Sequence, residues 1–299
     1  MLTRKLRMGL RIGVMVFLAV LSSCERINDS AHKEDFEDAK SFLYFQHAAW
    51  VSIQMAEHIN STGSTLGINF KSLDTLSKQL NAEFKIFDST YLDNNGIQYE
   101  LSFTENTHQN YNPNLHFTRY HFDGKLNVEV NQNYREIGSK STLTITESSP
   151  LKIDYPGFGK VEIYGKIELE RTGSNLIKVD YKDFKIRFDS EIYDWDADLE
   201  YSWLKGAETD GIWNDQIKIS GKGEYLEKDE SDGYSEFNIL NHLTKSLEPG
   251  CSDYIQTGIV TLKTEHGEYV LDFDPFKNAS CGSLVRLTRK NEELEFQGP

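Results

Sequence analysis

Alternation of side-chain character constrains the fold of this chain more than any other feature, and residues 193–203 show it most clearly. One parity is aromatic or apolar, and the other is mostly acidic. Successive side chains of a strand point to opposite faces of a sheet, so this stretch predicts a strand with one dry and one wet face. Such strands are typical of antiparallel sheets. The dry set is Tyr193, Trp195, Ala197, Leu199, Tyr201 and Trp203, and the wet set is Asp194, Asp196, Asp198, Glu200 and Ser202.

The same alternation recurs throughout residues 83–299, together with a weak repeat. A glycine stands in the middle of an alternating run, and polar turns such as 171–175, 228–233 and 265–267 lead into a second run. We therefore predict a mainly β domain, an antiparallel meander of β-hairpins. A curved open sheet, a barrel-like sheet and a sandwich all fit this pattern. The repeated glycines, which we expect to mark bends or bulges of long strands, are Gly124, Gly165, Gly221 and Gly258.

Residues 34–82 have a helical period instead. Two acidic pairs in residues 34–38 suit a helix N-terminus, and an apolar stripe follows them, so we predict a helix from Glu34 to Ile59. We expect residues 60–64 to end it and a shorter helix to follow at 71–80. The first helix is predicted to cover the core, with a protein-docking helix as the alternative. The stripe comprises Phe42, Phe45, Ala49, Ala56 and Ile59, with Leu43, Trp50 and Ile53 beside it.

The first 23 residues have the pattern of a secretory signal peptide. Four basic residues and no acid precede an apolar run at 12–21, which is too short to span a bilayer as a helix. Leu21-Ser22-Ser23-Cys24 resembles the bacterial lipobox, in which the cysteine is joined to diacylglycerol and becomes the first residue after cleavage. By that resemblance Cys24 carries a lipid anchor, and residues 24–33 form a polar tether.

Charge excludes some partner classes. The chain has 32 basic and 47 acidic residues; removal of the four basic residues in 1–23 leaves 28 basic residues and a net charge of −19. Such a surface disfavours nucleic acid and anionic lipid surfaces as partners. We therefore expect contact with the membrane through the anchor, and a protein or a glycan as any further partner.

Two cysteines remain besides Cys24. Cys251 and Cys281 form an even pair in an exported chain and flank the last predicted hairpin, so we predict a disulfide between them. The run Pro249-Gly250-Cys251, a glycine-centred strand at 258–262, the Asp-Phe at 272–273 and Cys281 resemble the C-terminal unit of uncharacterised lipoproteins from Bacteroidota. That resemblance covers about fifty residues beyond the lipobox. It implies an envelope location and β structure, but no activity.

Motifs of catalysis and metal binding are missing from the sequence. It contains no Walker loop, no Gly-x-Ser-x-Gly and no His-Glu-x-x-His. Asp194-x-Asp196-x-Asp198 opens like a calcium loop, but Leu199 and Lys205 stand where an EF-hand needs Gly and Glu. We therefore assign no catalytic residue, no metal site and no cofactor.

Three functions remain. We favour a non-catalytic binding or structural lipoprotein of the bacterial envelope; the alternatives are a hydrolase of envelope glycans and a carrier for lipid or lipoprotein. Trp203 and Trp213 are candidates for stacking on sugars, although we expect most aromatic side chains to lie in the core. Glu25 after Cys24 favours the outer membrane, with the side undecided. Candidate O-glycosylation sites, by resemblance to the Asp-Ser/Thr-apolar sequon of Bacteroidota, are Ser30, Thr75 and Ser89.

Overall fold

The computed structural model describes residues 30–66, 82–88, 97–103, 120–131, 136–155, 159–188, 191–206, 215–227, 234–248, 251, 255–278, 284–290 and 292–297. They form one helix and fourteen strands. The helix is α2 (Ser30–Leu66). The strands are β1 (Ala82–Asp88), β2 (Ile97–Phe103), β3 (His121–Val130), β4 (Lys140–Ile145), β5 (Leu151–Tyr155), β6 (Gly159–Gly173), β7 (Leu176–Phe188), β8 (Glu191–Lys205), β9 (Gln216–Glu227), β10 (Tyr234–Ser246), β11 (Thr257–Thr264), β12 (Gly267–Asp272), β13 (Leu284–Arg289) and β14 (Glu292–Gln297).

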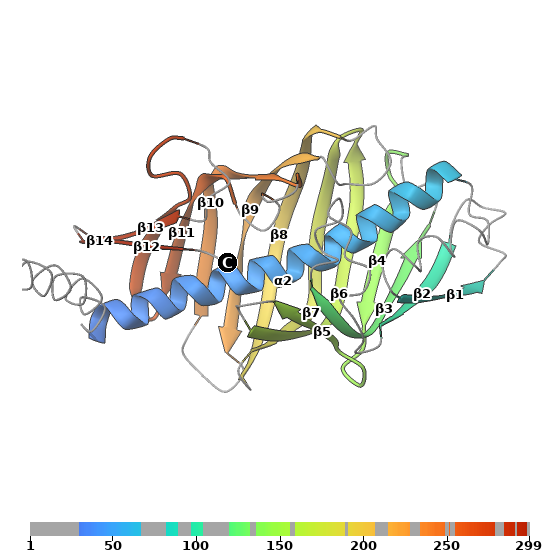
Figure 1. Ribbon diagram of the computed structural model, residues 1–299, viewed down its shortest axis with the longest axis horizontal. Coiled ribbons are helices and arrows are strands. Elements are labelled where there is room, and N and C mark those ends of the chain that lie inside the picture. The colour runs from blue at the N-terminus through green and yellow to red at the C-terminus, as the bar shows by residue number, and fades with distance from the viewer. Residues whose placement is uncertain are drawn as a thin grey trace, which may run out of the picture.

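The strands make a single antiparallel sheet in chain order, as Figure 1 shows. Each strand pairs with the next, except that β4 pairs directly with β6 while β5 bridges β3 and β6. Strands β1 and β14 are the two edges, so the sheet is an open one. The predicted antiparallel meander is confirmed, and among the three closures that the sequence allowed, the curved open sheet is the one found.

Burial along β8 follows the predicted alternation. Its aromatic and apolar parity is buried from Trp195 to Trp203, and its acidic parity is exposed or half-buried. The predicted turns also connect paired strands: β6 with β7, β9 with β10, and β11 with β12. Two-fold periodicity was therefore a sufficient guide to which face of the sheet is dry.

Helix α2 runs across the strands on that dry face (Figure 1). Its contacts follow the strand order in reverse as the helix advances. Phe36 packs on Phe296 of β14, with ring centroids 5.1 Å apart. The remaining pairs along the helix are Phe42 with Phe237 of β10, Phe45 with Tyr225 of β9, Trp50 with Tyr201 of β8, and Glu57 with Arg171 of β6.

The helix is a buried core element and differs from its prediction in two ways. All residues from Phe42 to Met55 are buried, including the polar Gln46, His47 and Ser52, so no face of this stretch meets solvent. The helix also begins four residues before Glu34 and continues past the expected break to Leu66. Propensity costs below about 1 kcal/mol per residue explain the second error, because residues 60–64 are too weakly unfavourable to end a helix that has already formed.

The repeated glycines lie where the strands bend, as predicted. Gly124, Gly165, Gly221 and Gly258 all have φ between +115° and +136°, a region that favours glycine. At Gly165 the pairing of β6 with β7 shifts by one residue, which is the signature of a bulge. A Cβ atom at this position would lie 2.6 Å from the Cα of Phe184. Bends of this kind let long strands curve toward the helix.

Candidate functional site

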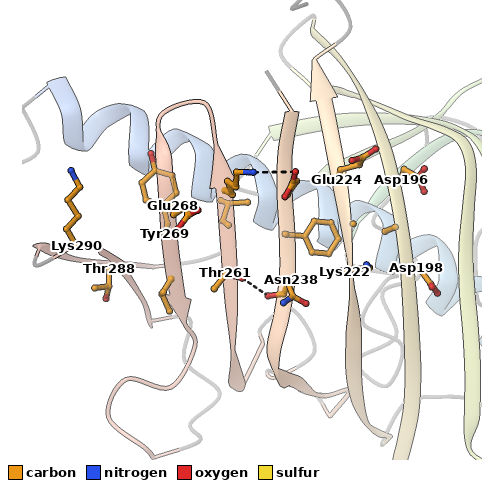
Figure 2. Close-up of a pocket in the computed structure, with 17 residues that line it drawn as sticks. Asp196, Asp198, Lys222, Glu224, Asn238, Thr261, Glu268, Tyr269, Thr288 and Lys290 are labelled. Carbon is orange, nitrogen blue, oxygen red and sulfur yellow. Dashed lines mark hydrogen bonds and ion pairs between the residues drawn. The ribbon is translucent and has the colours of Figure 1, made fainter. Parts of the chain in front are cut away.

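The hollow in Figure 2 lies on the opposite face of the sheet from the helix, across β8–β13. It encloses about 1050 Å³. Its floor includes Phe237, whose ring packs on Phe42 of α2 on the other side of the sheet. Its polar walls come mainly from alternate residues of β8–β13, with Lys290 after β13 and the buried Tyr269 beneath them. The lining residues labelled in Figure 2 are Asp196, Asp198, Lys222, Glu224, Asn238, Thr261, Glu268, Tyr269, Thr288 and Lys290.

Strand register aligns the polar side chains of the hollow in rows. In one row Asp196 lies opposite Glu224, which lies opposite Glu236 on the next strand. Lys263 follows, with its Nζ 3.6 Å from a carboxylate oxygen of Glu236, and Glu268 lies beyond it. Two carboxylates directly opposite one another on a sheet are destabilising. The carboxylates of this row therefore repel one another, and a positively charged ligand bound beside them would relieve that repulsion.

The adjacent row is less acidic. Asp198 lies opposite Lys222, which lies opposite Asn238, and Thr261 and Val270 continue the row. Across the hollow the lining carries five carboxylates and three lysines. The surface therefore has a net formal charge of −2, with hydrogen-bonding groups beside the charges.

The carboxylates of the hollow are exposed to solvent, and this limits the reactions that they could catalyse. Asp196, Asp198, Glu224, Glu236 and Glu268 are all exposed. A carboxylic acid that protonates a glycosidic oxygen is normally held in a desolvated pocket, which raises its pKa. No group of three or more His, Cys, Asp and Glu side chains in the described part of the chain is placed to hold a metal ion. The hollow is thus suited to binding a charged or polar partner.

A second cluster of polar side chains lies inside the core, under the C-terminal half of α2. Glu57 is buried, and its Oε2 lies 3.9 Å from Nη2 of Arg171, which is also buried. Arg171 Nη1 donates to the carbonyl oxygen of Ser174 at 2.9 Å. Glu57 Oε1 has no hydrogen-bond partner among the described residues. Burial raises the pKa of Glu57 to about 8, against the lowering effect of Arg171 and with a smaller raising effect of Asp215.

Asp215 precedes β9 and lies close to this centre. Its Oδ2 accepts a hydrogen bond from the indole Nε1 of Trp203 at 2.7 Å, and its carbonyl oxygen accepts one from the main chain of Leu247. Burial raises the pKa of Asp215 to about 6, while the Trp203 hydrogen bond and the charge of Lys205 oppose the shift. Neither Glu57 nor Asp215 lines the hollow, so the carboxyls with perturbed pKa values are separate from the open binding surface.

The stacking role predicted for Trp203 is wrong. Its side chain is 6% exposed and bonded to Asp215, so no face of the ring is open to a sugar. The three aspartates of β8 whose spacing resembles the start of a calcium loop have different surroundings. Asp194 is paired with Lys185 of β7, and Asp196 and Asp198 line the hollow. The acidic alternation of β8 accounts for all three.

Several predicted site residues lie outside the described residues: Cys24, Thr75, Ser89, Trp213 and Cys281. Ser30 is the first residue of α2, inside the predicted tether, and Cys251 is buried in a turn after β10. The Cys251–Cys281 pairing therefore stays a prediction. Sequence reasoning also missed Glu57, Arg171 and Asp215, because isolated charged residues at those positions carry no motif.

Comparisons with family models, with curated proteins and with solved structures return no match. Among the described residues, no helix combines the length and apolar character needed to cross a bilayer.

Proposed function

We propose that this protein is a lipid-anchored component of the bacterial envelope, favoured at the outer membrane, that binds a partner non-catalytically on the outer face of its sheet. The observation that carries the proposal is the hollow over β8–β13, with its row of opposed carboxylates at Asp196, Glu224 and Glu236. That row favours a protein segment or a glycan that presents positively charged groups.

The hydrolase alternative has weaker support. Carboxylates do share the hollow, but all of them are exposed, which leaves none in the desolvated setting of a general acid. The buried carboxyls, Glu57 and Asp215, lie in the core and do not line the hollow.

The carrier alternative would require α2 to leave the dry face of the sheet. Phe42, Phe45, Trp50 and Ile53 are each at most 2% exposed. Burying one such side chain contributes about 1.5–3 kcal/mol, so exposing these four alone costs on the order of 10 kcal/mol. Bound cargo would have to replace that whole contact, and we therefore favour a partner on the outer face.

Replacement of the predicted acylated cysteine tests the anchor. We expect Cys24→Ala to lose labelling by an azide-bearing palmitate analogue and to retain residues 1–23, because the lipidated thiol is also the signal for cleavage in the lipobox resemblance. Intact mass and gel fluorescence read both effects. Cys251→Ala is the matched control and should keep the label; a labelled Cys24→Ala variant would remove the anchor from the proposal.

Neutralising the carboxylate row tests the binding surface. We expect Glu224→Gln with Glu236→Gln to weaken binding of oligolysine or of a glucosamine oligomer at least tenfold by calorimetry at low salt, because the opposed carboxylates supply the attraction. Glu83→Gln with Glu129→Gln makes the same charge change on exposed acids of β1 and β3. Equal losses in the two double variants would mean diffuse attraction by net charge and no site.

The disulfide between Cys251 and Cys281 belongs to the same proposal. Closing a loop of this length stabilises a chain by roughly 3–4 kcal/mol in the entropy model. Peptide mapping without reductant should recover the two cysteines in one linked peptide, and recovery of both as free thiols would reject the pair.

A further inference from the structure

We infer that the end of the molecule formed by the first turns of α2 and by strands β11–β14 faces the bilayer, while the β1–β4 end points away from it. This inference rests on the lipid anchor proposed at Cys24. It assigns a membrane-facing surface to a definite part of the fold and sets the height of the hollow above the lipid.

Covalent geometry limits where the anchor can be. Ser30 lies six residues after Cys24, and a fully extended chain of six residues spans at most about 22 Å. Helix α2 has 37 residues and is therefore about 55 Å long. The first turn of the helix is consequently held near the bilayer surface, whereas its last turn can lie more than twice as far from the anchor.

Contacts at the beginning of α2 join this end of the helix to the C-terminal strands. The carboxylate of Asp38 accepts hydrogen bonds from Thr264 of β11 at 2.7 Å and lies 3.1 Å from the ring Nδ1 of His266 in the following turn. Phe36 packs edge-on against Phe296 of β14. In Figure 1 the blue start of α2 lies beside the red strands accordingly. The anchor therefore draws β11–β14 toward the membrane together with the helix.

The distribution of charge distinguishes two orientations: one in which only this end faces the bilayer, and one in which the outer face of the sheet lies flat on it. Flat contact through the outer face would press its acidic rows against the bilayer. One row is described above, and a second joins Glu168, Asp180 and Asp198 across β6–β8. Anionic headgroups repel such a surface, so the charges tilt the far end of the sheet away from the lipid.

The membrane-facing end is itself acidic, so it stays in water above the headgroups and does not insert. Strand β14 carries Glu292, Glu293 and Glu295, and Arg286 of β13 donates to Glu295 at 2.7 Å. A charged edge strand of this kind is costly to bury in hydrocarbon. The acyl chains alone would hold the protein, with the β13–β14 edge in water above them.

This orientation also places the hollow in the membrane-proximal half. Phe42, which packs behind its floor, is twelve residues from Ser30, or about 18 Å along the helix axis. A partner bound over β8–β13 would therefore meet the protein close to the bilayer, at the level of membrane-bound glycans and of neighbouring anchored proteins.

Energy transfer to the membrane tests the orientation in the full-length lipidated protein. A fluorophore is attached through an azide-bearing phenylalanine derivative in place of Glu292 in one variant and of Glu83 in the other. Both positions are exposed acids on edge strands, at opposite ends of the sheet. Vesicles of phosphatidylethanolamine and phosphatidylglycerol carry a rhodamine lipid as acceptor. We expect transfer at least twofold more efficient from position 292 than from position 83.

The outcomes separate the anchor from the orientation. Flotation with the vesicles and an acylated N-terminal peptide in mass spectrometry establish the anchor in the same samples. Equal transfer from the two positions, or stronger transfer from position 83, would overturn the orientation while leaving the anchor intact. A protein that does not float would overturn the anchor and the orientation together.

Discussion

Substituting Gly165 by alanine should destabilise the protein by about 3–5 kcal/mol. Its φ of +120° is a conformation that side chains rarely adopt, which costs about 1–3 kcal/mol. The added methyl group would also lie 2.6 Å from the Cα of Phe184 and closer still to the carbonyl oxygen of Asp183. These are main-chain atoms of β7 that cannot rotate away, and overpacking of this kind adds about 1–3 kcal/mol. Urea unfolding followed by circular dichroism measures the loss.

Gly138→Ala is the matched control for this substitution. Gly138 also has a positive φ, +87°, but nothing lies within 4 Å of a Cβ atom placed there. We expect only the conformational cost, about 1–2 kcal/mol. Equal losses at both positions would mean that the close approach of β6 and β7 contributes nothing and that the bend at Gly165 is soft.

The repeated glycines show how much of the fold is determined by the local sequence. Gly165 and its three counterparts stand out in the sequence because each interrupts an alternating run, and their positive φ values follow from the same local need to bend. The two faces of β8 were likewise predictable from Trp195, Asp196 and their neighbours, because a strand encodes its dry face in every second residue. Local rules of this kind were enough to predict an antiparallel meander.

The candidate site depends on information that is not local. Asp196 and Glu236 meet in one row only because β9 pairs with both β8 and β10 in a particular register. Burial of the polar side of α2 is also a tertiary effect. His47 resembles a solvent-facing residue until its Nε2 is seen 3.0 Å from the hydroxyl of Tyr120. A periodic pattern contains no information about partners so far away in sequence.

The pH dependence of stability should reveal the state of Glu57. Its pKa is raised from 4.5 to about 8 by burial, so the folded protein binds a proton more tightly than the unfolded chain does. Stability is then fully present below about pH 4.5 and is lost as the pH rises toward 8. A shift of this size corresponds to a loss on the order of 5 kcal/mol across that window. Asp215 acts in the same direction between its usual pKa of 3.8 and about 6.

Glu57→Gln separates the contribution of Glu57 from that of Asp215. The amide resembles the protonated acid in shape, so we expect a variant as stable as the wild type near pH 5 and more stable by several kcal/mol at pH 8. The loss of stability that Asp215 causes as the pH rises from 3.8 to about 6 should remain. Urea unfolding between about pH 3.5 and 9 measures both curves, with Glu100→Gln, on an acid paired with Lys125 at the sheet surface, as the control.

Destabilisation by Glu57→Gln would instead show that Glu57 is ionised in the folded protein. Were Glu57 ionised in the folded protein, its carboxylate would balance the buried Arg171 at 3.9 Å. Removing one partner of a buried ion pair costs about 3–5 kcal/mol, because the other charge is left without compensation. A Glu57→Gln variant that is less stable than the wild type by that amount at pH 7 would show that the ion pair, and not a neutral acid, holds α2 against β6.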